Sequence, residues 1–367
     1  MFQFDPLACG RLALCALLLT VQAAAFASDV PDVVNRASIQ SARATMSTIL
    51  GISRAGSRLV AAGERGIVLV SDNEGRDWRQ VVVPVSVTLT SVFFASGKEG
   101  WIVGHSGIVL HSTDAGETWK KQLDGIQAAK RVADLARNDA VRFAGDLARA
   151  EIVANAERFE KDGADKPFLD IHFSDERNGI IVGAYGLAFA TRDGGQSWLP
   201  INNRIPNPKE KHLYRIINDG SNLWIAGEQG ALFRSNDDGE SFVEVKTPYA
   251  GTFFGAVAAD NCNLLVFGLR GNALFTDDCG KRWSKVENRM EASLTAGIRL
   301  KSGVMMLVDQ AGRLLESRDN GRTLTPLEKN FHYPLTNILE VGEGGLVLTG
   351  IAGVTRYVPA STKGKNR

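Results

Sequence analysis

Short apolar runs separated by turn residues dominate the hydrophobic pattern of this chain. A representative stretch holds four such runs, each rich in β-branched or aromatic residues: 90–94, 101–103, 108–111 and 118–121. Runs of this length, bounded by Gly, Asp and Ser, are typical of β-strands. Residues 126–160 differ, because their apolar side chains recur at alternating steps of three and four, which predicts helix.

The four-run unit repeats along the chain. Each copy carries two glycines separated by two residues before its third run, with Asp in the first position of one copy: Gly63/Gly66, Gly104/Gly107, Gly183/Gly186, Gly227/Gly230, Gly268/Gly271, Asp309/Gly312 and Gly350/Gly353. Most neighbouring copies lie about 41 residues apart, which is the period of a four-stranded propeller blade. Seven copies predict an all-β fold, a seven-bladed β-propeller, since a sandwich or barrel would not give so regular a period.

Six copies continue into a second motif, a box with the pattern Ser/Thr-x-Asp/Asn-x-Gly-x-x-Trp/Phe/Leu. Its third residue is Asn73, Asp114, Asp193, Asp237, Asp278 or Asp319. We expect the side-chain oxygen of this residue to accept hydrogen bonds from backbone N–H groups two residues on. The glycine supplies a positive φ, and the aromatic residue begins the outer strand and wedges against the neighbouring blade. The boxes are therefore interpreted as structural.

The seventh copy has no box and offers only three strands, around residues 336–341, 346–349 and 354–358. Residues 32–38 precede the first blade and are otherwise unused. The sequence therefore predicts that this N-terminal segment adds the fourth strand and closes the ring, which would remove exposed sheet edges.

The first 27 residues have the features of a signal peptide. Arg11 precedes a short apolar run, and Ala25-Phe26-Ala27 forms a cleavage site of the small-residue type. The alternative, a short membrane anchor, would need a longer apolar run. The predicted organisation is a signal peptide (1–27), one propeller (28–358) and a basic tail (359–367).

Cleavage at this point would leave two of the four cysteines, Cys262 and Cys279. Export would place them where a disulfide can persist. They fall in two turns at the same end of the fifth blade, so a bridge is geometrically plausible, and two unpaired thiols are the alternative.

The helical segment 126–160 lies between the second and third blades. Gly145-Asp146 in its middle would either kink one long helix or split it into a hairpin. The segment is either packed on its own propeller or used as a docking arm for a partner. Because it leaves from a connection between blades, it shares a face with the Gly-x-x-Gly turns, and the boxes lie on the opposite face.

The residues between the paired glycines vary from copy to copy, so this face is where a ligand site is expected. The candidates are His105, Tyr185, Glu228 and Arg270, and ordinary solvated turn residues are the alternative.

Charge and motif content exclude several function classes. The chain has 42 basic and 41 acidic residues, a net charge of +1, which argues against a nucleic-acid partner. The five histidines are scattered without metal-ligand spacing, and none of the common hydrolase, nucleotide-binding or redox motifs occurs. The sequence predicts no catalytic residue, no cofactor and no metal site.

The boxes resemble the Asp-box repeats of sialidases and related glycosidases, where they are structural. Arg204-Ile205-Pro206 looks like the Arg-Ile-Pro motif of sialidases, but it follows the third box, whereas sialidases place it before the first. A glycan-binding or glycoside-hydrolysing propeller is therefore kept as the alternative function.

The stretch from Gly104 to Trp119 more closely resembles the photosystem II assembly and stability factor family and its bacterial relatives. The resemblance covers about residues 30–358 without the helical insertion. It implies an exported, non-catalytic scaffold that holds a membrane-protein complex during assembly through an arginine patch. The arginines that would serve are those around the first blade: Arg54, Arg58, Arg65, Arg76 and Arg79.

The same resemblance implies a location and a partner. The protein would be a monomer in the periplasm or secreted, or in the thylakoid lumen if the organism is photosynthetic. Its partner would be a complex in the adjacent membrane, such as a transporter. The insertion departs from the family pattern and makes a different partner from that of the photosynthetic members the expectation.

Overall fold

The structure is a computed structural model that describes residues 32–139, 146–163, 165–259, 262–288 and 290–359. The predicted signal peptide, its cleavage site and all but the first residue of the basic tail lie outside these ranges. Within them, no helix is both long enough and apolar enough to cross a membrane.

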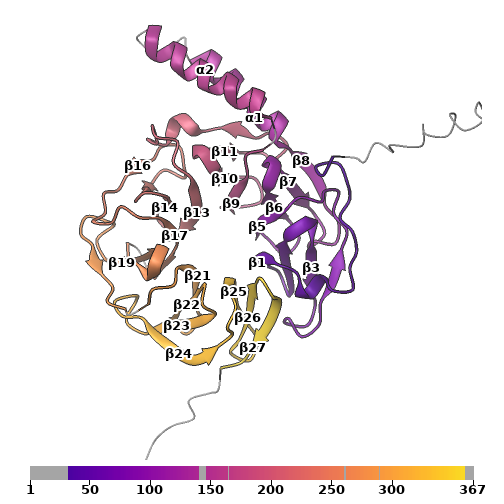
Figure 1. Cartoon of the computed structure of the whole chain (residues 1–367), viewed down its shortest axis with the longest axis vertical. Helices are drawn as coiled ribbons and strands as arrows, with labels where there is room; N and C mark the ends of the chain where they lie inside the picture. The colour runs from indigo at the N-terminus through magenta and orange to yellow at the C-terminus, as the bar shows by residue number, and fades with distance from the viewer. Residues whose placement is uncertain (1–31, 140–145, 164, 260–261, 289, 360–367) are drawn as a thin grey trace, which may run out of the picture. The chain divides into compact units, whose positions relative to one another are not determined.

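Seven antiparallel sheets are arranged around a common centre, as the sequence predicted (Figure 1). Blade 1 consists of β1 (Ile49–Ala55), β2 (Arg58–Gly63), β3 (Val68–Ser71) and β4 (Arg79–Val81), and blade 2 of β5 (Leu89–Phe94), β6 (Gly100–Gly104), β7 (Val109–Ser112) and β8 (Lys120–Leu123). Blade 3 consists of β9 (Phe168–Phe173), β10 (Gly179–Gly183), β11 (Ala188–Thr191) and β12 (Leu199–Pro200). Blade 4 consists of β13 (Leu213–Asn218), β14 (Leu223–Gly227), β15 (Leu232–Ser235) and β16 (Val243–Glu244).

Blades 5 to 7 follow the same order, with the first strand of each innermost. Blade 5 consists of β17 (Phe253–Ala258), β18 (Leu264–Gly268), β19 (Ala273–Thr276) and β20 (Ser284–Lys285). Blade 6 consists of β21 (Leu294–Arg299), β22 (Met305–Asp309), β23 (Arg313–Ser317) and β24 (Thr325–Asn330), and blade 7 of β25 (Leu335–Val341), β26 (Gly345–Gly350) and β27 (Gly353–Tyr357). Apolar side chains of neighbouring sheets meet between the blades, and this is where the buried core lies.

Threonines near the start of three inner strands bond across to the next blade. The Oγ1 of Thr90 donates to the carbonyl of Phe168 at 2.7 Å, and that of Thr336 donates to the carbonyl of Ile49 at 2.6 Å. The second bond joins β25 to β1 and so connects the last blade to the first.

The prediction that residues 32–38 complete the last blade is wrong. Among the described residues that blade has three strands, and the N-terminal segment runs along blade 1 instead, where the N–H of Ser38 donates to the carbonyl of Val83 at 2.9 Å. The physical reason is burial: Val34 is 5 % exposed and packs with the alternating valines that follow β4. The chain then reaches β27 as a short 3₁₀ turn, η1 (Ala44–Met46), beside Gly353.

Each of the six boxes is closed by two side-chain acceptors. In blade 2, the Oγ of Ser112 accepts from the N–H of Gly116 at 2.9 Å, and the Oδ1 of Asp114 accepts from the N–H of Thr118 at 2.9 Å. The other boxes repeat this pair of bonds. The Asp or Asn thus reaches four residues on, not two as expected, because the Ser or Thr also holds the turn.

The glycine of each box is needed for two reasons, its left-handed backbone conformation and the lack of space for a side chain. Gly116 has φ +81°, and an added Cβ would lie 3.0 Å from Val60 of the preceding blade and 3.3 Å from Trp119. Trp119 is 6 % exposed, and its indole N–H donates to the carbonyl of Gly116 at 3.0 Å. The box therefore connects its own blade to the one before it, as the sequence predicted for the aromatic residue.

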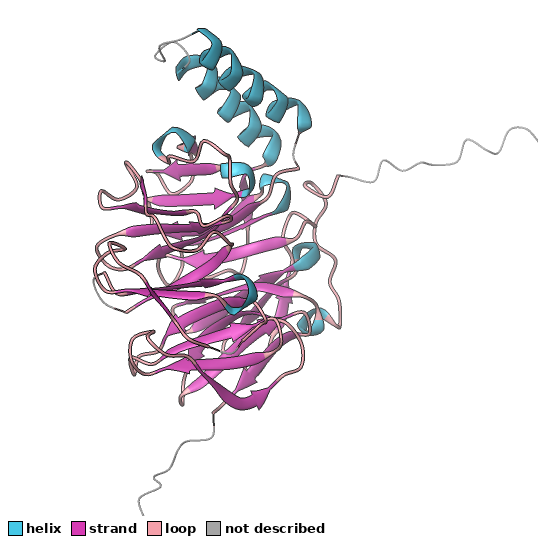
Figure 2. Cartoon of the chain, turned by 60° about the vertical axis from the view of Figure 1, so that its left-hand side comes forward, coloured by secondary structure: helices cyan, strands magenta, loops and turns pink. Residues whose placement is uncertain are grey.

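The helical insertion is two helices, α1 (Gly125–Asp139) and α2 (Asp146–Asp162), which lie side by side (Figure 2). Small side chains make the contact, with Ala133, Ala136 and Ala156 buried together. Arg137 adds an ion pair to Glu160 at 2.9 Å. We refer to α1 and α2 as the helical hairpin; Gly145, where the sequence placed the break, lies outside the described residues.

Cys262 and Cys279 are joined in a disulfide, with Cα atoms 4.2 Å apart. The bond ties the turn between β17 and β18 to the box between β19 and β20. It thus clamps one end of blade 5.

Replacing Cys279 with serine is expected to lower the free energy of unfolding by about 2–3 kcal/mol, because the bridge closes a loop of 17 residues. Urea unfolding with and without dithiothreitol measures this. The reductant should bring the wild-type protein to the stability of the variant and leave the variant unchanged. Two free thiols in a non-reducing peptide map of the purified protein would contradict the prediction.

Candidate functional site

The two faces of the ring carry different features, as the sequence predicted. One face, the turn face, carries the Gly-x-x-Gly turns and the connections between blades. The hairpin leaves from it, since a Cβ added to Gly107 would lie 2.6 Å from the Cα of Gly125 at the start of α1. The other face, the box face, carries the six boxes.

In five of the Gly-x-x-Gly turns one residue, exposed in all of them but blade 2, adopts a left-handed conformation. The residue before the second glycine has a φ between +51° and +57° in five blades: Arg65, Ser106, Tyr185, Gln229 and Arg270. The glycines are needed because the turn is crowded by backbone; a Cβ on Gly104, for example, would lie 2.4 Å from the carbonyl oxygen of Thr88. The turn face is thus a ring of fixed, outward-facing turns.

The five arginines singled out from the sequence do not form one patch. Arg65 lies on the turn face, whereas the other four lie on the box face in ion pairs. These pairs are Arg54 with Glu74 at 2.9 Å, Arg58 with Asp72 at 2.6 Å and Glu117 at 2.9 Å, Arg76 with Glu343 at 3.0 Å, and Arg79 with Glu117. Their positive charge is therefore largely cancelled, and what they do is connect blades 7, 1 and 2.

Glu74 is the centre of this network. The guanidinium of Arg54 donates to both of its carboxylate oxygens, at 3.0 and 2.9 Å, and the N–H of Gly342 in blade 7 donates at 3.0 Å. The bonds from Arg54 are the main reason that the pKa of Glu74 falls to about 2; burial opposes the shift and the Gly342 N–H adds to it. The carboxylate thus stays charged where the last blade meets the first.

Glu74→Gln is expected to remove about 1–2 kcal/mol of stability at pH 7, a value reduced for partial exposure. A carboxylate with a lowered pKa stabilises fully above its unfolded value near 4.5 and loses this as the pH falls toward about 2. The stability curves of wild type and variant should therefore converge between pH 4.5 and 2 in urea unfolding. Glu343→Gln, at a more exposed carboxylate, is the control and should cost under about 0.5 kcal/mol. Parallel curves would contradict the prediction.

The four turn residues proposed from the sequence separate into one pair and two isolated positions. Tyr185 and Glu228 meet at His212: the N–H of Tyr185 donates to His212 Nδ1 at 3.0 Å, and Glu228 Oε1 accepts from the N–H of His212 at 2.8 Å. His105 belongs to blade 2 and Arg270 to blade 5, so neither joins this pair.

Beside Tyr185 lies a groove of about 1110 Å³, between the helical hairpin and the propeller, at the blade 3 turn and the connection to blade 4. Its hairpin wall comes from α1, α2 and the residues that follow: Val132, Leu135, Ala136, Asn155, Ala156, Arg158, Phe159, Asp162, Asp165 and Lys166. Its propeller wall comes from the blade 3 turn and the connection to blade 4: Tyr185, Gly186, Leu187, Asn202, Asn203, Ile205, Pro206, Asn207, Pro208 and Glu210. The sequence predicted the face and Tyr185, but not the rest.

Lys166 holds the two walls of the groove together. It is 8 % exposed, and its ammonium lies 5.4 Å from the ring centre of Phe159 on α2 and 5.3 Å from that of Tyr185 on blade 3. Burial opposes its charge, but hydrogen bonds to Asp165 and Asp162 outweigh that effect and raise its pKa. A permanent cation between two aromatic rings therefore fastens the hairpin to the propeller.

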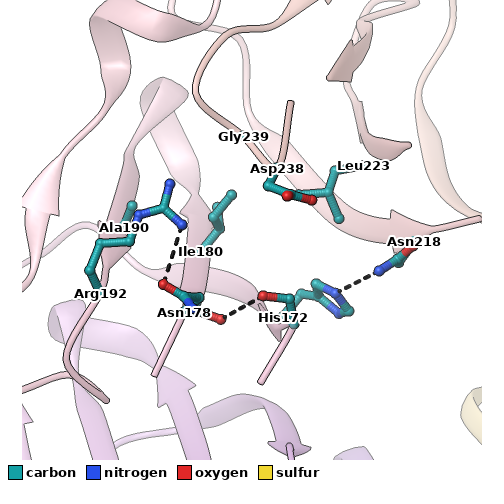
Figure 3. Close-up of a pocket in the computed structure, with 11 residues that line it drawn as sticks. His172, Asn178, Ile180, Ala190, Arg192, Asn218, Leu223, Asp238 and Gly239 are labelled. Atoms are coloured by element: carbon teal, nitrogen blue, oxygen red, sulfur yellow. Dashed lines mark hydrogen bonds between the residues drawn. The ribbon is translucent and has the colours of Figure 1, made fainter. Parts of the chain in front are cut away.

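A second cavity, on the box side of blades 3 and 4, is too small for a substrate (Figure 3). It measures about 30 Å³, room for about one water molecule. Burial lowers the pKa of His172 there, and its Nε2 accepts from Asn218 Nδ2 at 3.4 Å. In the described part of the chain, no three His, Cys, Asp or Glu side chains gather as metal ligands.

Comparison with known proteins assigns the family. The family model described as "Photosynthesis system II assembly factor YCF48" matches residues 62–128 and 159–288, which is more than half of the chain. The chain belongs to this family. The match is interrupted between residues 128 and 159, so most of the helical hairpin is an addition to the YCF48 propeller.

Individual relatives agree with the assignment. The chain is 26% identical over 212 residues to the chloroplast photosystem II stability/assembly factor HCF136 of Oryza sativa, covering 49% of this chain and 50% of that protein. It is 33% identical over 84 residues to the photosystem II assembly lipoprotein Ycf48 of a Synechococcus strain, covering 22% of this chain and 25% of that protein. The aligned part thus spans half or less of these relatives.

The fold of the family is also seen in a solved structure of YCF48 bound to a D1 peptide. It superposes with a TM-score of 0.63 at 18% identity, covering 89% of this chain and 97% of that one. At this identity the likeness is one of fold.

Proposed function

We propose that this protein is a non-catalytic assembly factor that holds a segment of a membrane protein on the turn face of its propeller. The observation that carries the proposal is the groove of about 1110 Å³ on that face, which is slightly larger than the usual range of small-molecule pockets. Membership of the YCF48 family supports it, as does the peptide bound to the YCF48 relative.

We further propose that the protein works after export, in the periplasm or an equivalent compartment, on a complex of the adjacent membrane. The signal-peptide pattern of residues 1–27 supports this location. The hairpin supports a partner other than the photosynthetic one, because it forms one wall of the groove and lies largely outside the family match.

The glycosidase alternative finds less support. The guanidinium of Arg204 bonds to Glu240 at 2.9 Å and so serves the box of blade 4, while Ile205 and Pro206 form part of the groove wall. A sialidase would need this arginine for the substrate carboxylate.

Photo-crosslinking in living cells tests the proposal. A benzoylphenylalanine in place of Tyr185, which is 51 % exposed at the groove, should crosslink to one membrane protein. The same residue in place of Val243, 54 % exposed on the outer strand of blade 4, is the matched control and should not. Deleting the gene for this chain should lower the amount of the assembled complex on native gels. No membrane-protein crosslink at Tyr185 and an unchanged complex would overturn the proposal.

A further inference from the structure

We infer that His212 makes the blade 3 turn sensitive to pH: the neutral imidazole holds the turn through the backbone N–H of Tyr185, and protonation releases it. The inference goes beyond the proposed function, which requires no group that titrates. It concerns the groove nonetheless, because Tyr185 forms part of the propeller wall and its ring contacts Lys166.

The hydrogen bond from Tyr185 requires a neutral His212. The N–H of Tyr185 donates to His212 Nδ1 at 3.0 Å. A ring nitrogen that accepts a hydrogen bond carries no proton, so the imidazole is neutral and its proton is on Nε2. The side chain of His212 is 29 % exposed, so water can reach the ring and exchange protons with it.

The bond supports an otherwise unfavourable conformation of Tyr185. This residue has φ +55°, in the left-handed region that few residues with a side chain adopt. The rings of Tyr185 and His212 also meet edge to face, with centroids 4.8 Å apart. Because Tyr185 is 51 % exposed, water can solvate its N–H once the bond is lost. Loss of the bond therefore frees Tyr185 without leaving a buried donor unpaired.

A protonated His212 has a different partner close by. An imidazolium carries a proton on both nitrogens and has no acceptor, so its Nδ1 would oppose the N–H of Tyr185, donor to donor. Its Nε2 lies 3.9 Å from Oε1 of Glu228, in the turn between β14 and β15. Rotation of the ring toward this carboxylate would shorten the ion pair and move Nδ1 away from Tyr185. The neutral form thus favours the bond to Tyr185, and the charged form favours the contact with Glu228.

The titratable groups around His212 come from both neighbouring blades. Those of blade 4, those next to it in the chain and those on the blade 3 side are Glu228, Tyr214, Lys211, Tyr185 and, behind the ring of Tyr185, Lys166. Burial and the charge of Glu228 raise the pKa of Tyr214 above its usual value, so its phenol stays neutral. Among these residue types, histidine is the one that changes charge between pH 8 and 5.

Blade 5 has the same turn with an acceptor that does not titrate. There the equivalent N–H, that of Arg270, donates to Ser293 Oγ at 3.2 Å. Ser293 and His212 occupy the same place in the fold, since each directly precedes the inner strand of the following blade, β21 or β13. A hydroxyl accepts the bond whatever the pH between 5 and 8. Histidine at this place therefore makes one turn, the one beside the groove, dependent on pH.

Nuclear magnetic resonance of the purified, ¹⁵N-labelled protein between pH 8 and 5 tests the inference. The protection of the Tyr185 amide against hydrogen exchange, corrected for the intrinsic pH dependence of exchange, should fall at least tenfold as the pH decreases. The fall should coincide with the titration of the His212 ring. The Arg270 amide is the internal control and should keep its protection within twofold. A Tyr185 amide that stays protected down to pH 5 would overturn the inference.

His212→Ser gives blade 3 the acceptor that blade 5 uses. Protection of its Tyr185 amide should differ less than twofold between pH 8 and 5. His105→Asn is the matched control, because His105 is an exposed histidine in the blade 2 turn of the same face, and this variant should behave as the wild type. A loss of protection in His212→Ser that follows the wild-type curve would overturn the assignment to His212. The wild-type titration needs no substitution and so decides the question even if His212→Ser does not fold.

These measurements need no partner, so the inference and the proposed function can fail separately. A pH-independent Tyr185 amide would overturn the inference and leave the crosslink from position 185 as support for the proposed function. A pH-dependent amide, with neither a crosslink nor a change in the assembled complex, would overturn the proposed function alone.

Discussion

Trp101→Ala is expected to lower the free energy of unfolding by about 3–5 kcal/mol, the range for deleting a large, fully buried aromatic side chain. Trp101 on β6 is 0 % exposed, and its ring stacks on Phe173 of blade 3 with centroids 3.6 Å apart. Its indole N–H donates to the carbonyl of Gly194, in the box of blade 3, at 3.3 Å. One side chain thus connects two blades, and its loss leaves a cavity between them.

Urea unfolding followed by tryptophan fluorescence and far-UV circular dichroism measures the loss. Trp101→Phe keeps most of the apolar area but not the hydrogen bond, so it should cost about 1–2 kcal/mol. If Trp101→Ala unfolded within about 1 kcal/mol of wild type, the contact between blades 2 and 3 would not depend on this residue.

Asp309→Ala is expected to cost a similar amount, about 3–5 kcal/mol, because it removes one partner of a buried ion pair. Asp309 is 0 % exposed and stands where the other blades have the first glycine of the turn. Its Oδ2 accepts from Arg313 Nε at 2.6 Å, and its Oδ1 accepts from the N–H groups of Ala311 and Arg313, each at 2.9 Å. Alanine would leave two backbone donors and a guanidinium without these bonds.

Asp309→Gly provides the control that the repeat itself suggests. It restores the Gly-x-x-Gly spacing of the other copies and allows the turn to adopt their conformation, so it should cost less than Asp309→Ala in the same urea experiment. Equal losses would mean that the carboxylate bonds are needed and that the glycine turn cannot replace them. Neither substitution touches the groove, so the membrane-protein crosslink from position 185 should persist in the folded variants.

The blades and boxes could be predicted because their determinants are local. A box is closed by bonds from Ser112 and Asp114 to N–H groups four residues away, and its glycine is required by the φ of its own residue. The spacing of such motifs at about 41 residues is enough to count the blades. The sequence also showed that Asp309 replaces the first glycine in the turn of blade 6, but it could not show that Asp309 pairs with Arg313.

The candidate site was predictable only in outline. The connection that carries the hairpin and the Gly-x-x-Gly turns must share a face, since strand direction alternates within each blade. That reasoning led to Tyr185. It could not lead to the hairpin wall of the groove, because only packing brings residues of α1 and α2 opposite the blade 3 turn.

Sequence alone thus determined the propeller, its seven blades, the role of the boxes and the face that bears the insertion, because each depends on residues close together in the chain. Tertiary structure decided how distant residues pair. Burial of Val34 against the valine row drew the N-terminal segment to blade 1, and carboxylates of blades 7, 1 and 2 neutralised arginines that the sequence presented as a free patch. It also placed the hairpin against blade 3, opposite the connection to blade 4, and so created the groove. These contacts join segments that lie far apart in the sequence. Each segment had several possible partners in space, and only the packing of the folded chain selects one of them.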